Sequence, residues 1–295
     1  MSPATTTRTA TRNGFATNPR VAAVWAGVAR GRAELGQTFR TPQDLWNYFF
    51  PNAILLVVMF FMKGATVPGT SFSLGSRTLP SVVGMGVAFT GMVSLAMSLA
   101  VEREDGTLLR AKAVPNGMLG YLIGKITLLS GMVVIGQVII LVPSLIMLDG
   151  ISINWFTLAW VVVIGLVATL PIGAVVGSLF SNPRNAGLVM LPMMGLTAIS
   201  GIFYPISSMP DWLQGVAQVF PIYWLGLGMR SAMLPDALRM AEIGDSWRQL
   251  ETLGVLVAWA AVGLLLAPMV MRRMARRESG STVAARRERA MQRVT

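Results

Sequence analysis

Six apolar runs that contain no Asp, Glu, Lys or Arg constrain the fold of this chain more than any other feature. A helix of about 20 residues, rising ~1.5 Å per residue, crosses a hydrocarbon core of about 30 Å. The 295-residue chain is 54% hydrophobic and 13% charged, a composition typical of membrane proteins. We therefore predict an all-α integral membrane protein with six transmembrane helices at residues 45–62, 79–101, 126–148, 154–180, 186–209 and 252–271.

A seventh apolar run, Trp212–Met229, differs from the other six. It contains Gln214, Gln218 and a central Pro221, and Pro breaks a helix interior. Seven crossings would also place the two arginine-rich ends of the chain on opposite sides of the membrane. We therefore predict that this run is a short external re-entrant helical hairpin between spans five and six.

The basic residues predict the orientation of the six spans. With both termini in the cytosol, 19 of the 24 Lys and Arg residues face the cytosol and five face outward. This bias follows the positive-inside rule, and each Arg near the membrane gains about 1 kcal/mol from anionic lipid. The net charge of +11 thus indicates membrane lipid as a partner and argues against nucleic acid.

The regions flanking the spans differ in composition. We predict a disordered basic tail at residues 1–18, an amphipathic interfacial helix at 19–40, the six-span domain at 41–271 and a basic cytosolic tail at 272–295. Apolar residues recur at helical spacing in the second region, at positions 21, 25, 28, 35 and 39. Glycines 27, 31 and 36 favour the alternative, a longer unstructured tail.

Several kinds of chemistry lack their residues. The chain has no histidine and no cysteine, and its expected spans carry no ionisable side chain to couple transport to an ion. The stretch Gly120–Lys125 fails the phosphate-loop pattern because Leu119 and Ile126 stand at its required positions. We expect no enzyme activity, metal site or cofactor on this chain. Gly120 and Gly124 instead predict a small-residue face for close helix packing.

A charged loop separates the second and third expected spans. It reads Glu102-Arg103-Glu104-Asp105-Gly106-Thr107-Leu108 and is followed by Pro115 and Gly124-Lys125. A solvated turn or acids at a helix N-terminus would explain the charges taken singly. The whole run, however, resembles the loop of ABC type-2 exporter permeases, where E-R-E-x-G-T-L leads into an ATPase-coupling helix, a Pro follows, and G-K opens the third span. Leu109 and Val114 depart from that pattern.

A second stretch covers residues 200–214 and continues to Pro221-Ile222-Tyr223 and Arg230. It resembles the signature that follows the fifth span of the same permeases. The resemblance implies an outer gate, in which Gly and Pro break the helix and aromatic side chains plug the break. An ordinary helix end with interfacial aromatics is the alternative for any one of these residues. The implied gate residues are Gly201, Phe203, Tyr204, Pro205, Met209, Pro210 and Trp212.

The resemblance implies the transmembrane subunit of an ABC exporter, similar to the drug and antibiotic (daunorubicin-type) branch, in the bacterial plasma membrane. Its implied partners are an ABC ATP-binding subunit, which holds ATP and Mg²⁺, and a second permease, identical or related. The cargo would be a hydrophobic or amphiphilic small molecule in a cavity lined by Phe89, Met92, Met193 and Met194. The alternatives are core packing for these methionines, and, for the chain, a lipid- or glycan-exporting permease or a membrane assembly or anchor protein.

The predicted topology can be tested with cysteines, because the natural chain has none. In intact cells Thr5→Cys and Ala290→Cys should be protected from an impermeant thiol reagent, whereas Phe72→Cys should react. Labelling of one terminus alone would show an odd number of spans.

Overall fold

Helices make up most of the chain that the structure describes. The computed structural model describes residues 18–66, 72–180, 183–202 and 205–277. Within these ranges the extended structure consists of one isolated β-bridge, between Thr66 and Ser73. The all-α prediction is therefore confirmed for the described residues.

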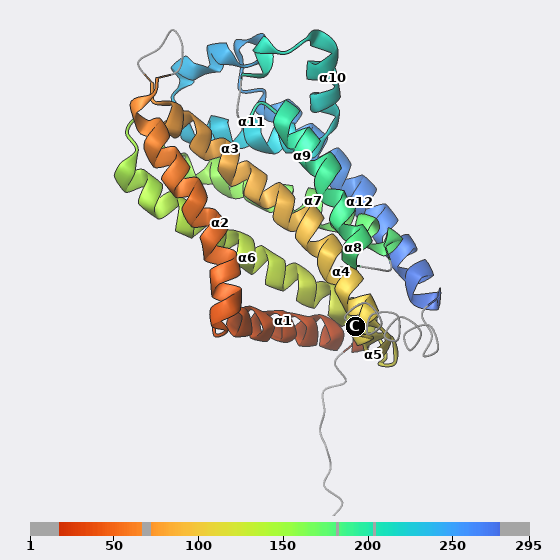
Figure 1. Ribbon diagram of the computed structural model, residues 1–295. Helices are drawn as coiled ribbons and strands as arrows, with labels where there is room; N and C mark the ends of the chain where they lie inside the picture. Colours follow the sequence, from red (N-terminus) through yellow and green to blue (C-terminus); the bar gives the residue numbers. More distant parts are fainter. Residues whose placement is uncertain (1–17, 67–71, 181–182, 203–204, 278–295) are drawn as a thin grey trace, which may run out of the picture.

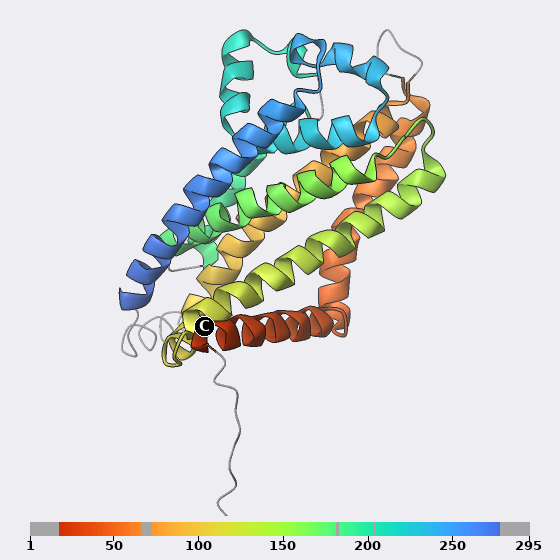
Figure 2. The same cartoon turned by 180° about the vertical axis from the view of Figure 1, so that it is seen from behind.

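Five helices of the described chain are long and apolar enough to cross a membrane. Each overlaps one of the predicted spans, and α3, α6, α7 and α12 run side by side as a slanted bundle (Figures 1 and 2). The five comprise α2 (Pro42–Phe61) with the 3₁₀ turn η1 (Met62–Gly64), then α3 (Leu74–Phe89) with η2 (Thr90–Ser94) and α4 (Leu95–Glu104), then α6 (Gly117–Met147), α7 (Trp155–Leu179) and α12 (Gln249–Arg277).

The helices α3, η2 and α4 form one continuous rod over residues 74–104, called the α3–α4 rod below. Its centre, η2, is a π-helix, in which each N–H bonds the carbonyl five residues back instead of four. The rod packs closely on α7 at this level, because a Cβ atom on Gly173 would overlap the carbonyl oxygen of Gly91. Small residues therefore bring the two backbones together.

The expected fifth span, residues 186–209, is not one continuous helix. Its helical part consists of α8 (Pro183–Ala186, 4 residues), η3 (Gly187–Val189, 3 residues) and α9 (Met190–Ile199, 10 residues). The helix ends at Ile199 because Gly201 adopts a left-handed backbone conformation, with φ +74°, a common helix stop. This segment supplies a shorter apolar helix, Gly187–Ile199, and the described residues contain five full-length candidate spans, not the six predicted.

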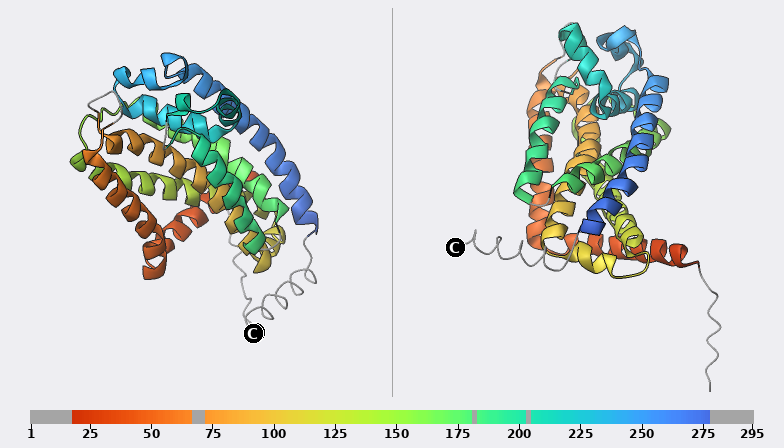
Figure 3. Two further views of the ribbon diagram at one scale, coloured as in Figure 1. Left: turned by 45° about the horizontal axis from the view of Figure 1, so that its top comes forward. Right: turned by 90° about the vertical axis from the view of Figure 1, so that its right-hand side faces the viewer.

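The helix α1 (Pro19–Thr38) lies across one end of the bundle, beside the start of α6 (Figures 1 and 3). It begins where the Asn18 side chain accepts a hydrogen bond from the Arg20 N–H, at 3.1 Å, an N-cap followed by Pro. Its buried residues are Gly27 and Gly31. These glycines were the argument for an unstructured tail, but here they form the contact face of a helix.

The contact between α1 and α6 is made by backbone against backbone. A Cβ atom on Gly27 would overlap the carbonyl oxygen of Gly120, and one on Gly31 would overlap that of Gly124. Such small residues at i and i+4 let two helices approach closely. The predicted packing role of Gly120 and Gly124 is therefore confirmed, and α1 is their partner.

The opposite end of the molecule carries a cap of shorter helices (Figures 1 and 3). The run predicted as a hairpin forms α10 (Asp211–Val219) and α11 (Pro221–Met233), separated at Phe220 because Pro221 starts a new helix. Nearly every residue of α11 is buried; α11 packs against α3, α7 and α12. Three 3₁₀ turns complete the cap: η4 (Ile206–Ser208), η5 (Asp236–Ala241) and η6 (Ile243–Asp245).

The glycine contact predicts a difference between two matched substitutions in α1. Gly31→Ala adds a methyl group against the Gly124 carbonyl, whereas Gly36→Ala adds it where no atom lies within 4 Å. Overpacking costs about 1–3 kcal/mol, and Ala in place of an exposed helical Gly gains up to about 1 kcal/mol. We expect Gly31→Ala to lower the thermal unfolding midpoint in detergent and Gly36→Ala to maintain or raise it. Equal midpoints would contradict the packing.

Candidate functional site

The predicted coupling motif forms the end of the α3–α4 rod and a sharp turn into a short helix. Glu102 and Glu104 lie in the last turn of α4, and α5 (Thr107–Lys112) follows at once. Gly106 turns the chain with φ +80°, which L side chains rarely adopt. The Asp105 carboxylate accepts a hydrogen bond from the Thr107 N–H at 2.7 Å, and so satisfies a backbone donor at the start of α5.

Arg103 points into the protein and fastens this turn to α7. Its side chain is 8% exposed. One guanidinium nitrogen donates to the Ser178 and Phe180 carbonyls, at 3.0 and 2.7 Å. These carbonyls belong to the end of α7, where helical carbonyls lack intrahelical partners. Arg103 therefore serves as the C-terminal cap of a different transmembrane helix.

A cluster of four charged residues joins α1, α4 and α6; it is called the charge cluster below. Lys125, only 7% exposed, lies between two carboxylates, with Nζ 2.9 Å from Glu34 Oε2 and 2.5 Å from Glu102 Oε1. Arg30 completes it, with Nε 2.7 Å from Glu34 Oε1. Each buried charge thus has an opposite partner, as low-dielectric surroundings require.

The charged neighbours of Glu34 favour its ionised form. Burial by itself would raise the pKa of Glu34, but the hydrogen bonds from Arg30 and Lys125 act in the opposite sense, and the net pKa is lowered. A lowered carboxyl pKa contributes stability that is present above the ordinary Glu range and lost as the pH falls through the folded value. Glu34 therefore remains ionised at neutral pH.

The solvent-facing surface of this region lies beyond the charge cluster. Leu108 is the buried residue of α5. The exposed residues of α5 and of the following turn are Arg110, Lys112, Ala113, Val114, Pro115 and Asn116. Four of the six predicted coupling residues therefore make contacts or a turn inside the protein; they are Glu102, Arg103, Gly106 and Leu108. The accessible surface comes mainly from residues 110–116.

A second buried ion pair lies at the opposite end, in the cap. Arg230 of α11 is 1% exposed and binds Glu242 through two nitrogens, at 2.7 Å (Nε–Oε1) and 3.0 Å (Nη2–Oε2). Its Nη1 donates to Ser81 Oγ of α3 at 3.2 Å and to the Gly201 carbonyl at 3.4 Å. One guanidinium therefore joins α11, α3, the rest of the cap and the helix break at Gly201, after α9.

The predicted gate residues occupy different environments. Phe203 and Tyr204 lie outside the described residues. Gly201 interrupts the helix after α9, and its carbonyl accepts a hydrogen bond from Arg230. Trp212, in contrast, is 71% exposed. The half-buried residues of the set are Pro205 and Met209, and Pro210 is exposed. Buried side chains at this break include Ile202 and Ile206, which the sequence analysis did not single out.

The four residues of the predicted substrate cavity are spread over two parts of the fold. Phe89 and Met92 belong to the α3–α4 rod, and Met92 lies against Gly173 of α7. Met193 is buried on α9, while its neighbour Met194 is largely exposed. None of the four lines the cavity that the structure shows between α2, α3 and α6.

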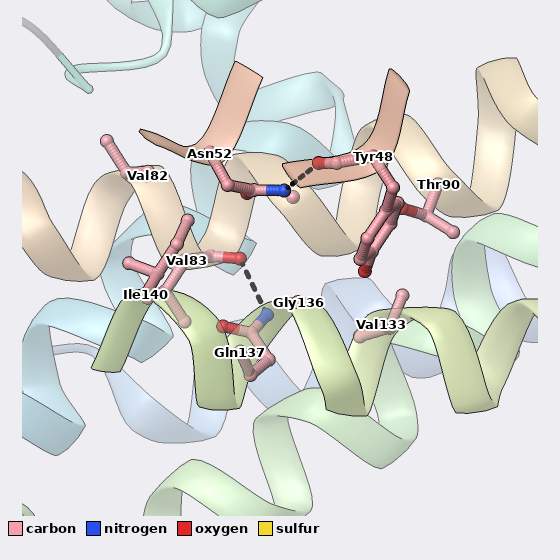
Figure 4. A pocket seen from close by; sticks show the side chains of 10 residues that line it. Tyr48, Asn52, Val82, Val83, Thr90, Val133, Gly136, Gln137 and Ile140 are labelled. Carbon is pink, nitrogen blue, oxygen red and sulfur yellow. Dashed lines mark hydrogen bonds between the residues drawn. The ribbon is translucent and has the colours of Figure 1, made fainter. Parts of the chain in front are cut away.

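That cavity contains polar residues that sequence reasoning missed. Tyr48, Asn52, Thr90 and Gln137 come from three different transmembrane helices and line one space (Figure 4). These four side chains carry no charge, so the absence of Asp, Glu, Lys and Arg from the expected spans does not reveal them. The available signal was an amide side chain within an apolar run, as Asn52 and Gln137 are.

The fold and these sites define a helical membrane protein whose short helix, α5, is fastened to the transmembrane bundle by buried charges. A family model described as ABC-2 family transporter protein matches residues 41–267 of the chain. The chain belongs to that family. It is therefore a membrane subunit for transport and not itself an enzyme, as the resemblance of its two motifs predicted. No curated protein matches the chain.

The charge cluster can be tested by replacing Lys125 and comparing it with an exposed lysine. Lys125→Met leaves two glutamates without their shared partner, and breaking a buried pair costs about 3–5 kcal/mol. Lys63 pairs with the exposed Asp149 at 3.2 Å, so Lys63→Met should cost about 0–1 kcal/mol. Thermal unfolding in detergent should show a large decrease for Lys125→Met and almost none for Lys63→Met.

A double variant serves as the control for this cluster. Glu102→Gln added to Lys125→Met removes the charge that is left unpaired, since Glu34 still has Arg30 as its partner. The free energy of unfolding should therefore recover in part. Similar midpoints for the two lysine variants, or no recovery in the double variant, would show that the cluster contributes little.

Proposed function

We propose that the chain is the permease subunit of an ATP-driven exporter in the bacterial plasma membrane. A separate ABC ATP-binding subunit holds ATP and Mg²⁺. It docks on residues 110–116, which form the end of α5 and the turn after it. The cargo is a hydrophobic or amphiphilic small molecule, of the drug or antibiotic kind handled by the daunorubicin-type branch. Membership of the ABC-2 family supports the exporter role.

The observation that carries this proposal is the attachment of α5 to three other helices. Arg103 joins the turn before α5 to the end of α7, while Glu102 joins it through Lys125 to α6 and α1. A displacement of α5 by the ATP-binding subunit therefore moves the α3–α4 rod and α7 together. A solvated loop would absorb such a displacement without moving the spans.

The other end of the rod supports the same mechanism. The rod carries Ser81, which accepts a hydrogen bond from Arg230, and Arg230 also donates to the carbonyl of Gly201 at the helix break. Movement of the rod thus reaches the segment proposed as the outer gate. The proposal requires two states with different contacts at both ends, since coupling is a difference in free energy between states.

The proposed topology places α1 and α5 in the cytosol and the α10 cap outside. The short apolar helix Gly187–Ile199 then forms a sixth crossing together with η4, on the other side of the helix break at Gly201. Both termini lie in the cytosol. A second permease, identical or related, completes the transporter. Large apolar side chains are exposed on α2, among them Trp46, Phe50, Ile54, Val57 and Phe61, and they suit contact with lipid.

Two arginines of one loop separate docking from coupling. Arg103→Met removes a contact inside the permease, so the ATP-binding subunit should still copurify and hydrolyse ATP, while cargo transported per ATP falls about tenfold or more. Arg110→Glu reverses a charge on the exposed surface and should weaken copurification instead. Copurification and transport per ATP in reconstituted vesicles measure the two effects.

An arginine at the far end is the control. Arg239 is exposed in η5, and Arg239→Glu should alter neither copurification nor transport per ATP. The proposed function fails if no ATP-binding subunit copurifies with the natural chain, or if Arg103→Met leaves transport per ATP unchanged.

A further inference from the structure

The cavity between α2, α3 and α6 is a polar site within the transmembrane bundle. Its volume is about 90 Å³, enough for a small polar group. Apolar side chains, including Val82, Val133 and Ile140, form part of its wall, and the polar side chains described above form the rest (Figure 4). No Asp, Glu, Lys or Arg lines it.

One N–H of each amide in this cavity is already used by the protein. Asn52 Nδ2 donates to the Tyr48 carbonyl at 2.7 Å, and Gln137 Nε2 donates to the Val83 carbonyl at 3.1 Å. The Tyr48 hydroxyl donates to the carbonyl of Met132. These bonds fix the orientation of both amides.

The acceptor groups of the cavity remain unused. Among the described residues, Asn52 Oδ1, Gln137 Oε1 and the Thr90 hydroxyl have no hydrogen-bond partner. Each of the three residues is half-buried. A carbonyl oxygen without a partner inside a bilayer is unfavourable, so the three oxygens favour a molecule that brings N–H or O–H donors.

The position of the cavity suits a molecule that enters from lipid. Asn52 lies midway along α2, a helix whose apolar side chains are largely exposed. Thr90 is the first residue of the π-helix η2, and π-helical turns occur frequently at functional sites. The cavity thus combines a lipid-facing wall with fixed hydrogen-bond acceptors.

Taking the transport role above as its premise, we propose that this cavity binds the uncharged polar head of an amphiphilic cargo, a carboxamide or hydroxyl group. The head donates hydrogen bonds to Asn52, Gln137 and Thr90. Its alkyl chain leaves past α2 toward lipid. A carboxylate and a cation are both disfavoured because the cavity holds no opposite charge.

Thiol protection tests this site in the full chain, which has no natural cysteine. Gly86 lines the cavity, and a Cβ atom added there would meet no atom within 4 Å. Gly86→Cys in lipid nanodiscs should react with the small neutral reagent methyl methanethiosulfonate, and decanamide should slow that reaction. Decane and decanoate, which have the same chain length, should slow it less than about twofold. Gly254→Cys, at an equally open position in α12, is the control and should not be protected.

Substitution of the acceptors completes the experiment. Thr90→Val keeps the side-chain volume and removes the hydroxyl, and Asn52→Leu removes the amide. Each should raise the decanamide concentration for half-protection about fivefold, the usual effect of one hydrogen bond. The unprotected rate at Gly86→Cys reports whether each variant keeps the cavity.

Three results would overturn the proposal: an unreactive Gly86→Cys, equal protection by decane and decanamide, or unchanged half-protection in both variants. The assay needs neither ATP nor an ATP-binding subunit. If protection is absent while the complex still exports cargo, the site assignment fails alone. If protection is present while no ATP-binding subunit associates, the proposed function fails and the binding site stands.

Discussion

The arrangement depends on the requirement that charge buried away from water must be paired. Lys125 meets this requirement between Glu34 and Glu102, and the pairing ties three helices that are far apart in the sequence. The bond is specific because removal of any member leaves an uncompensated charge. Hydrophobic burial is non-directional and holds the bundle together without specifying how α1, α4 and α6 meet at this end. The charge cluster provides that information.

The close approach of α1 and α6 makes the charge cluster feasible. Gly27 and Gly31 allow the two backbones to touch at Gly120 and Gly124, which brings Glu34 within reach of Lys125 one turn further on. At the far end the Arg230–Glu242 pair performs a comparable role. The molecule therefore has a polar joint at each end and an almost uncharged middle, and the α3–α4 rod contacts both joints.

Much of this fold could be predicted from the sequence, and the exceptions have physical causes. The length of an uncharged apolar run reflects the bilayer thickness, and five of the six expected spans overlap helices that are long and apolar enough to cross a membrane. The run at residues 186–209 is equally apolar, but the left-handed turn at Gly201 shortens its helix, and composition does not report backbone conformation. The motif at Glu102–Leu108 identified the family, yet which side chains turn inward depends on α7, 75 residues away in sequence for the Arg103–Ser178 bond. The polar cavity was missed because Asn52, Gln137 and Thr90 acquire meaning only when three helices meet.

The π-helix in the middle of the α3–α4 rod makes the length of that rod as important as its composition. A π-helical turn accommodates one residue more than an α-helical turn, and one residue corresponds to about 100° of rotation about the helix axis. The half of the rod that carries Glu102 is therefore rotated relative to the half that begins at Leu74. Deleting a single residue between Thr90 and Ser94 would regularise the helix and turn Glu102 away from Lys125, although every charged side chain would still be present. The phase of the helix, set at its centre, decides whether its two ends can both meet their partners.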